Sequence, residues 1–495
     1  MKRGRVILVG AGPGDAGLLT RRGERALGDA QVVLADRLVG PGVLALVPPG
    51  AELILVGKSS GHHPIPQEEI NALLVEKARE GKVVVRLKGG DPYLFGRGAE
   101  ELEAVRAAGI PVQMVPGVTA ALAVPAWAGI PVTHRAHSSS VHILTGHSGR
   151  GGSPELDCKS LARLGGTLVF MMGLTALEGI LAGLLQAGLD PATPAALVQN
   201  GTLPGQRRLT ATAATLPALA REAGITPPAV LVVGAVCALD TGDGDALPLF
   251  GTTALVTRPR SAGSALGDAL EALGCCVVPF PCIRPAAREG IALPAQLAGW
   301  IVFTSAFGVE VFFNTLRARG QDGRSLAGCR FAAIGARTAA ALEARGMLAD
   351  YVPEVYDAAH LARGLAERVA RGEGVLLFRA ANGTPELPEI LRRQGIGCTD
   401  LAAYDTLRES PAAPWAREAL LGGEIDFVTF TSASTVDGFA GAVGEEAARC
   451  GRFTGVCIGE ATARRAGERG ISCAVSGTAS VDGMVERILR LKREG

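Results

Sequence analysis

The sequence lacks an excess of charge of either sign. Its 49 lysines and arginines stand against 48 aspartates and glutamates, which leaves a formal net charge of +1. Without a global basic field the protein is not expected to bind nucleic acid or an anionic membrane surface, so an anionic ligand must meet local groups. Long hydrophobic runs are also missing, because PPAVLVVGAVCAL is shorter than the ~20 residues that span a bilayer. A membrane protein is therefore not expected either.

Patterns typical of disulfide or metal sites are missing as well. The ten cysteines contain no C-x-x-C pair, and Cys275 and Cys276 are direct neighbours, so neither a disulfide framework nor a zinc knuckle is expected. The histidines between residues 134 and 147 are unevenly spaced and lack a cysteine or obvious carboxylate partner, which favours loop or anion-contacting histidines over metal ligands. The apolar run after MKRGR is soon interrupted by glycine, proline and aspartate, which makes a poor signal peptide. We expect a cytoplasmic protein without a bound metal.

Apolar residues and glycine, in contrast, are abundant. Hydrophobic residues make up 48% of the chain and 67 residues are glycine, which is typical of a well-packed globular protein with many tight turns. At ~150 residues per domain, the 495 residues indicate about three domains. β-branched apolar runs alternate with helical stretches, which predicts an α/β fold with largely parallel strands. The runs are VILVG, VVLAD, VVVRL, TLVFMM, AVLVVGAV, ALVT, IVFTS, FAAIG, VLLF, FVTFTS and GVCIG.

One segment rich in glycine, aspartate and proline, LDTGDGDALPLFG, interrupts this alternation at residues 239–251. Such a composition favours a linker. We therefore expect one part at residues 1–243, a linker at 244–251 and a second part at 252–495.

The second part contains an internal repeat. Three segments recur in the same order, at offsets of 121, 127 and 124 residues. Each carries a polar group at the end of an expected strand, where ligands of open α/β sheets gather. Each hydroxyl alone is explained by a helix cap, whereas the duplicated arginines favour a substrate-binding cleft between two lobes. The paired residues are Arg258 with Arg379, Ser305 with Ser432, and Thr338 with Thr462.

The first part opens with a glycine-rich turn, GPGDAG, at residues 12–17. Its letters fit G-x-G-x-x-G, and Asp36 follows at about the distance of a ribose ligand, so an NAD site is one interpretation. Pro13 weakens that interpretation, because it lacks the N–H that a phosphate-binding turn would use. The letters of this turn leave the question open.

Two further turns favour a different ligand site. Gly89 and Gly90 allow close backbone approach, and Asp91 offers an acceptor for a ribose hydroxyl or an amine. A third turn places Thr119 and Ala120 at the expected start of a helix. The first part therefore combines two glycine–acid turns with a turn of small residues.

These motifs resemble the uroporphyrinogen-III C-methyltransferase family, through GAGPGDAGLLT, ADRLV, VGK, RLKGGDPYLFGRG, VPGVTAALAVPAWAGIPVTHR, MMG and QNGT. The resemblance implies an S-adenosylmethionine-dependent enzyme, usually a homodimer, with its active site between two α/β domains that divide near residue 115. The residues it places in the S-adenosylmethionine pocket are Pro13, Gly89, Gly90, Asp91, Leu94, Thr119, Ala120, Met172 and Gly201.

The same resemblance implies acid–base roles for Asp36 and Lys58. A pyrrole carbon that attacks the sulfonium methyl group must afterwards lose a proton, and Asp36 is suited to accept it. On the residues alone, Asp36 would be a polar strand end and Lys58 a surface charge. The arginines suited to bind substrate carboxylates as bidentate forks are Arg37, Arg86, Arg97 and Arg135.

The second part resembles the uroporphyrinogen-III synthase family, through ALVTRP, FTSAFGVE, AIGARTA, FRAANG, AAYDT, FTSAST and CIGEATA. The resemblance implies two α/β lobes, about 252–284 plus 402–495 and about 285–401, and cyclisation of hydroxymethylbilane with inversion of ring D and loss of water. It implies no cofactor, and it matches Tyr404 with a proton donor to the departing hydroxyl, although a buried structural tyrosine explains this position equally well.

Together the resemblances predict a bifunctional tetrapyrrole enzyme that makes uroporphyrinogen III and methylates it twice to precorrin-2, on the sirohaem or cobalamin branch. Two alternatives stay open. The second part can be a non-catalytic small-molecule binding module joined to a methyltransferase, since it carries no P-loop, nucleophile elbow or metal cluster. The first part can be an NAD-dependent oxidoreductase, because of GPGDAG and Asp36.

Overall fold

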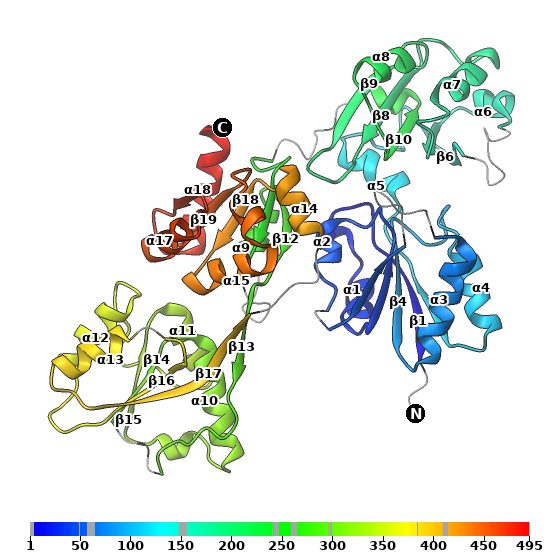
Figure 1. Cartoon of the computed structure of the whole chain (residues 1–495). Helices are drawn as coiled ribbons and strands as arrows, with labels where there is room; N and C mark the ends of the chain where they lie inside the picture. Colours follow the sequence, from blue (N-terminus) through cyan, green and yellow to red (C-terminus); the bar gives the residue numbers. More distant parts are fainter. Residues whose placement is uncertain are drawn as a thin grey trace. The chain divides into compact units, whose positions relative to one another are not determined.

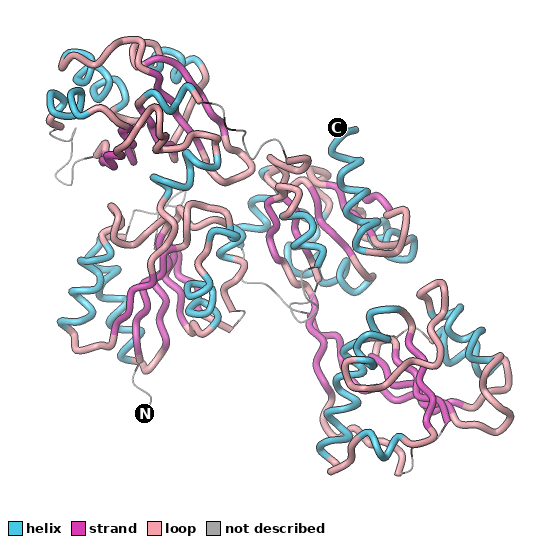
Figure 2. Tube along the Cα trace, turned by 180° about the vertical axis from the view of Figure 1, so that it is seen from behind, coloured by secondary structure: helices cyan, strands magenta, loops and turns pink. Residues whose placement is uncertain are grey.

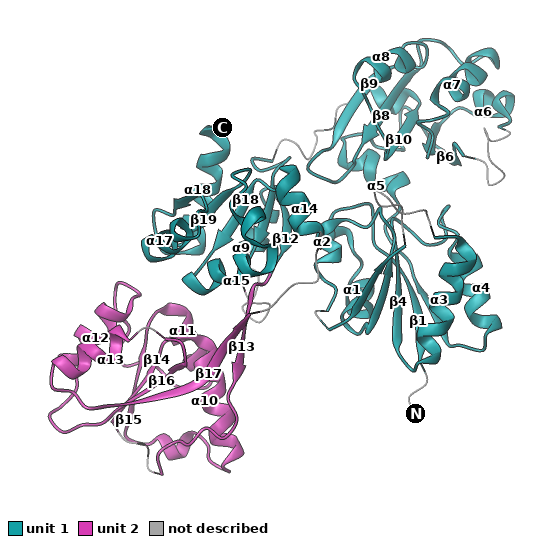
Figure 3. Cartoon of the chain, viewed as in Figure 1, with its two compact units in different colours: residues 1–257, 264–280, 411–495 teal, residues 258–263, 281–410 magenta. Residues whose placement is uncertain are grey.

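In the residues that it describes, the computed structural model contains four five-stranded sheets with helices around them (Figures 1 and 2). The chain forms two compact units, one of residues 1–257, 264–280 and 411–495, the other of residues 258–263 and 281–410 (Figure 3). Among the described residues, no helix is both long and apolar enough for a bilayer crossing. The structure describes residues 4–48, 50–56, 65–147, 156–239, 241, 247–258, 265–295, 297, 299–383, 385–408 and 414–494.

The first sheet is parallel, with strand order β3-β2-β4-β1-β5. Helices cover both faces, so its central strands are mostly apolar on both sides, except for Arg86 and Lys88 in β4. One face packs beneath α1 and α2, and the other packs beneath α3 and α4 (Figure 1). The elements are β1 (Arg5–Gly10), α1 (Arg21–Gly28), β2 (Val32–Ala35), α2 (Pro41–Leu44), β3 (Glu52–Leu55), α3 (Gln67–Arg79), β4 (Val83–Lys88), α4 (Gly98–Ala107) and β5 (Val112–Val115).

The second sheet has the order β6-β7-β10-β8-β9 and is mostly antiparallel. Only β6 and β7 run parallel, so the expectation of largely parallel strands is wrong for this sheet. Helix α5 packs on one face, and α6, α7 and α8 pack on the other. The elements are α5 (Ala120–Trp127), β6 (Val141–Thr145), α6 (Cys158–Leu164), β7 (Thr167–Met171), α7 (Leu177–Gln186), β8 (Pro194–Gln199), β9 (Arg207–Thr212), α8 (Leu216–Glu222) and β10 (Ala229–Val233).

The third sheet is built from two distant stretches of chain, in the parallel order β12-β11-β18-β19-β20. Leu249, within the expected linker, is fully buried in its core. The elements are β11 (Thr253–Val256), α9 (Ala265–Glu271), β12 (Cys276–Pro279), α14 (Pro414–Gly422), β18 (Phe427–Phe430), α15 (Ala433–Val443), α16 (Glu445–Ala448), β19 (Thr454–Cys457), α17 (Glu460–Glu468), β20 (Cys473–Val475) and α18 (Val481–Glu494).

The fourth sheet lies in the second unit, in the order β13-β17-β16-β14-β15. It is parallel except for β13, which runs antiparallel to β17. The elements are β13 (Ile283–Ala287), β14 (Gly299–Phe303), α10 (Ala306–Ala318), β15 (Cys329–Ala333), α11 (Ala336–Glu343), α12 (Ala358–Ala366), β16 (Val375–Ala380), α13 (Glu386–Arg393) and β17 (Cys398–Arg408).

The third and fourth sheets share one topology, as the internal repeat predicts. Strands β12-β11-β18-β19 of the third sheet correspond to β17-β16-β14-β15 of the fourth. The aligned arginines lie at the carboxyl end of the second of these strands, Arg258 two residues beyond β11 and Arg379 within the last two residues of β16, and the aligned serine follows the third strand in each sheet. The expected duplicated α/β fold of the C-terminal half is therefore confirmed.

Candidate active sites

Three turns of the first sheet come into direct backbone contact where β1, β4 and β5 end. Gly12 and Gly90 exchange two hydrogen bonds, with N···O distances of 3.2 and 2.7 Å. A Cβ atom on Gly117 would lie 2.1 Å from the Gly90 oxygen and 2.7 Å from the Gly10 Cα atom. No side chain fits there, which explains why glycine is needed at the carboxyl edge, where ligands of such sheets bind.

Asp91 joins two of these turns. Its Oδ1 accepts hydrogen bonds from the N–H groups of Tyr93 (2.8 Å) and Leu94 (3.2 Å), and its Oδ2 accepts one from Gly117 (3.0 Å). Oδ1 therefore stabilises the turn after β4, and Oδ2 joins that turn to the turn after β5. A contact of Asp91 with a ligand stays a prediction.

The start of helix α5, which packs on the second sheet, borders the same site. Thr119 caps α5, accepting a hydrogen bond from the N–H of Ala121 at 3.3 Å. Leu94 and Ala120 pack against the apolar cluster between α5 and the second sheet. The ideal Cβ position on Gly90 has the Ala120 nitrogen as its nearest atom, at 3.8 Å, so small residues border an open space here.

The first glycine turn also contacts the loop after β8. The N–H of Asp15 donates to Oγ1 of Thr202 at 3.2 Å. A Cβ atom on Gly14 would lie 2.9 Å from Leu203, and one on Gly201 would lie 2.3 Å from Val124. Half-buried Pro13 lies within the same turn. These contacts bring Pro13 and Gly201, both expected in the cofactor pocket, to the same region.

Backbone strain gathers near these turns. Left-handed conformations of non-glycine residues are uncommon and concentrate at functional sites. In the described part of the chain they occur only after β4, β7 and β8. The sequence marked two of them, Met172 through its family resemblance and Arg97 as a candidate for binding substrate carboxylates. The residues are Phe95, Arg97, Met172, Asn200 and Thr202.

Asp36 lies at the end of β2, where its N–H donates to the oxygen of Leu87 at 3.0 Å. Its Oδ1 lies 2.5 Å from Nη2 of Arg86, whose side chain is 2% exposed. The expectation that Arg86 binds a substrate carboxylate is therefore wrong, because its guanidinium is buried and paired within the fold. Lys58, the second expected acid–base residue, lies outside the described residues.

The other candidate arginines are exposed. Arg97 forms an ion pair with Glu100 at 2.7 Å, while Arg37 and Arg135 lie on the surface. Their roles toward a substrate stay predictions.

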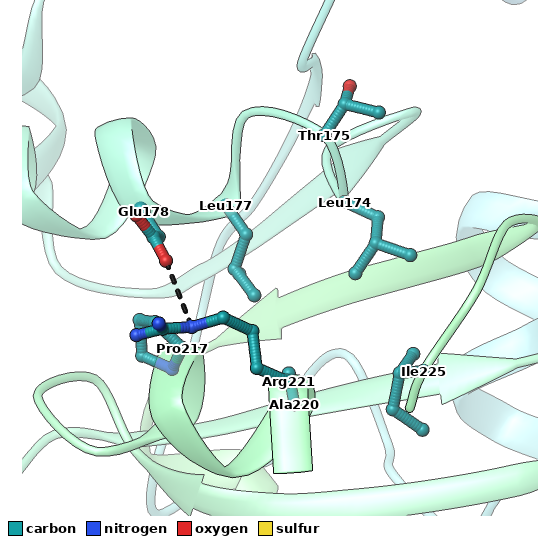
Figure 4. Close-up of a pocket in the computed structure, with 8 residues that line it drawn as sticks. All are labelled: Leu174, Thr175, Leu177, Glu178, Pro217, Ala220, Arg221 and Ile225. Atoms are coloured by element: carbon teal, nitrogen blue, oxygen red, sulfur yellow. Dashed lines mark ion pairs between the residues drawn. The ribbon is translucent and has the colours of Figure 1, made fainter. Parts of the chain in front are cut away.

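A surface depression of mixed polar and apolar lining lies elsewhere, between α7 and α8 (Figure 4). An exposed ion pair of Arg221 and Glu178, at 3.2 Å, spans its rim. None of the expected site residues lines it, and it lies away from the glycine turns. Its lining residues are Leu174, Thr175, Leu177, Glu178, Pro217, Ala220, Arg221 and Ile225.

In the second unit, two candidate residues meet. Oγ of Ser305 lies 2.6 Å from the hydroxyl of Tyr404, and it caps α10 by accepting a hydrogen bond from Gly308 at 3.0 Å. Tyr404 is 6% exposed and packs edge-on against Phe307. Burial raises the pKa of Tyr404, and the hydrogen bond to Ser305 opposes that rise. The sequence named both residues without indicating their contact.

The duplicated arginines differ in their surroundings. Arg379 forms a bidentate ion pair with Asp400, with N···O distances of 2.7 and 2.6 Å. Burial, and then the nearby Arg337, lower the pKa of Arg258. A cation beside another cation suits a polyanionic ligand, whereas Arg379 is already bound to a carboxylate. Substrate binding by either arginine stays a prediction.

The hydroxyl groups of the repeat act within their own helices. Ser432 forms a capping box on α15, in which its Oγ accepts from the N–H of Thr435 at 3.3 Å. Thr338 and Thr462 are buried at equivalent positions in α11 and α17. Capping therefore accounts for Ser432, and ligand contacts of these three residues stay predictions.

Each half of the chain matches one family. Residues 5–217 match the model of tetrapyrrole (corrin/porphyrin) methylases, and residues 264–486 match that of uroporphyrinogen-III synthase HemD. The porphyrin biosynthesis protein HemD of Ruminiclostridium josui is 42% identical over 504 aligned positions, which cover 99% of both chains. The siroheme synthase of Edwardsiella ictaluri is 53% identical over 239 residues, 48% of this chain and 51% of that protein. The chain therefore matches only about half the length of that second relative.

Solved structures give matches to each half. The uroporphyrin-III C-methyltransferase of Thermus thermophilus, complexed with S-adenosyl homocysteine, is 43% identical, with a TM-score of 0.41, over 47% of this chain and 98% of that chain. A mutant uroporphyrinogen III synthase of Thermus thermophilus is 22% identical, with a TM-score of 0.36, over 49% of this chain and 100% of that chain. The full-length relative and the two family matches show that the chain belongs to the porphyrin biosynthesis proteins in which a tetrapyrrole methylase is joined to a uroporphyrinogen-III synthase.

Proposed function

We propose that the C-terminal half, about residues 252–495, cyclises hydroxymethylbilane to uroporphyrinogen III. The N-terminal half, about residues 1–243, then transfers two methyl groups from S-adenosylmethionine to give precorrin-2. The observation that carries the methyltransferase assignment is the contact of the three glycine turns beside the strained loops of the second sheet. The 42% identity to a porphyrin biosynthesis protein, over 99% of both chains, supports the presence of both activities in one chain.

The turns fit S-adenosylmethionine because they expose backbone without side chains. Gly90 leaves open space toward Ala120, where a nucleoside can approach the main chain, while Gly89 and Gly117 let the turns pack closely against Leu38 and Gly90. S-adenosylmethionine supplies an electrophilic methyl group on a sulfonium sulfur. Asp36 is assigned to accept the proton that the methylated ring releases, so that the C–H electron pair returns to the ring. We further propose that the protein is a cytoplasmic homodimer, paired through the methyltransferase half.

In the synthase half, Tyr404 is assigned to protonate the departing hydroxyl group. The C–O bond of the hydroxymethyl group breaks, both electrons leave with oxygen, and the proton from Tyr404 completes a water molecule. Ser305 orients Tyr404, since the two hydroxyl oxygens are 2.6 Å apart. No cofactor is assigned to this half.

The full chain is tested with hydroxymethylbilane, first alone and then with S-adenosylmethionine. We expect uroporphyrinogen III in the first reaction and a product heavier by two methyl groups in the second. Asp36→Asn should lower methylation ~10²–10⁴-fold while cofactor binding and cyclisation persist, and Asp29→Asn, at an exposed site, is the matched control. Thermal stabilisation by NAD but not by S-adenosylhomocysteine would contradict the methyltransferase assignment. Failure of the C-terminal half to convert hydroxymethylbilane would contradict the synthase assignment and support the alternative, a non-catalytic binding module.

A further inference from the structure

Three buried charged side chains, Arg86, Lys88 and Glu101, form a network with Asp36 between the first sheet and α4. Glu101 Oε1 lies 3.0 Å from Nε of Arg86 and 2.8 Å from Nζ of Lys88. Arg86 in turn binds Oδ1 of Asp36 at 2.5 Å, and Lys88 Nζ lies 3.9 Å from its Oδ2. Gln67 of α3 donates to Glu101 at 3.1 Å. Two cations and two anions are thus joined in one network.

This network is poorly explained by stability. Arg86, Lys88 and Glu101 are almost fully buried, and Glu101 Oε2 has no hydrogen-bond partner among the described residues. Buried ion pairs recover their desolvation cost only with full pairing, and apolar residues of similar volume often give equal or greater stability. Asp36 is the one member with substantial exposure, with about 31% of its side chain accessible. The network therefore ends at the proposed proton acceptor.

We propose that Arg86 is a positioning residue for methylation, which orients Asp36 and places a positive charge against its carboxylate, and that Glu101 moderates this effect by binding the same guanidinium. The inference rests on the proposed function. Arg86 holds Oδ1, so Oδ2 is the oxygen that receives the proton from the methylated carbon while the C–H electron pair returns to the ring. Asp36 thereby becomes a neutral carboxylic acid, and solvent removes the proton before the next transfer.

Several other charged groups lie near Asp36 in the fold or in the sequence. From β4 these are Arg86 and Lys88, and from α4 Glu101. Burial above all, and then Arg86, lower the pKa of Lys88, while Asp36 and Glu101 oppose that shift. Arg37 follows Asp36 along the chain. At the start of α4, Arg97 and Glu100 form an exposed, mutually compensating pair, and Lys58 lies outside the described residues.

The test is the pH profile of kcat for methylation by the full-length protein. Arg86→Met removes the cation beside the Asp36 carboxylate, so the acidic limb should move to higher pH. Glu101→Gln removes a competing anion, so the limb should move to lower pH. The double variant should return toward the wild-type profile, and Arg86→Lys should restore most of it. A merely structural contribution would not move the limb in opposite directions.

Matched controls are Arg106→Met and Glu103→Gln, both exposed on α4, which should leave the limb in place. The KM for S-adenosylmethionine should change less than ~3-fold in every variant. If Arg86→Met does not fold, Glu101→Gln decides the matter alone. An unmoved limb in a folded Glu101→Gln protein, or a rise in KM that accounts for the whole loss of kcat/KM, would overturn the role of Arg86. A wild-type chain without methyl transfer would instead overturn the proposed function, and this inference with it.

Discussion

The contact of the three glycine turns predicts a large effect from a single added methyl group. In Gly117→Ala, the new Cβ atom would lie 2.1 Å from the Gly90 oxygen, whereas real Cβ atoms essentially never approach within 3.0 Å. The two turns must therefore separate by about 0.9 Å. Gly117 has no left-handed φ, so backbone conformation does not add to the cost.

The cost has two parts. Overpacking against rigid backbone costs about 1–3 kcal/mol, and weakening of the hydrogen bond from Gly117 to the Asp91 carboxylate adds about 1.5–3 kcal/mol. We expect the free energy of unfolding of the N-terminal half to fall by about 2.5–6 kcal/mol. S-adenosylhomocysteine should no longer stabilise the variant, which thermal unfolding with and without this ligand measures.

Gly179→Ala is the matched control. Gly179 lies in α7 with no atom within 4 Å of the added Cβ position, so alanine should stabilise by up to about 1 kcal/mol. An unfolding temperature and a ligand stabilisation equal to those of the wild type would show that the backbone contact does not constrain the site, and would refute the expected cost of Gly117→Ala.

Three further outcomes are expected. Burial raises the pKa of Asp15 despite the hydrogen bond from Gly17, so its charge lowers stability as pH rises above the unfolded value of ~3.9. Asp15→Asn should therefore raise Tm at neutral pH, by a margin that shrinks toward pH 4; an equal margin at both pH values would contradict this. Tyr404→Phe should lower the kcat of the synthase reaction strongly. The free energy of unfolding should fall by only about 1 kcal/mol, through loss of the hydrogen bond to Ser305. An unchanged kcat would exclude Tyr404 as the proton donor. Cleavage near residue 245 should yield two separately active halves, and two unfolded fragments would contradict that boundary.

The parts of the fold that follow from local pattern could be predicted from the sequence. Apolar runs marked the central strands, and the repeat revealed the shared topology of the third and fourth sheets. The strands β8 and β9 and their antiparallel pairing were not predicted, because PAALVQ and RRLTAT carry no signal of strand direction.

The candidate sites were only partly predictable, because pairing partners are distant in sequence. The glycine turns were recognised from their letters, but Arg86 could not be assigned until the fold buried it against Glu101. The alternation of Arg86 and Lys88 along the apolar strand β4 was an available signal of a buried charge network. Likewise nothing in the sequence pairs Arg379 with Asp400.

The divided third sheet imposes an order on folding during synthesis. The N–H of Thr253 in β11 donates to the Asp426 carboxylate next to β18, 173 residues later. At ~5–20 residues per second, a ribosome needs roughly 10–35 s to deliver β18 after β11 has emerged. During that interval the edge of β11 that later pairs with β18 stays unpaired, while all strands of the inserted fourth sheet have been synthesised. A nascent chain that stalls before residue 427 would thus carry a complete inserted lobe and an unpaired strand edge, a surface suited to recognition by chaperones.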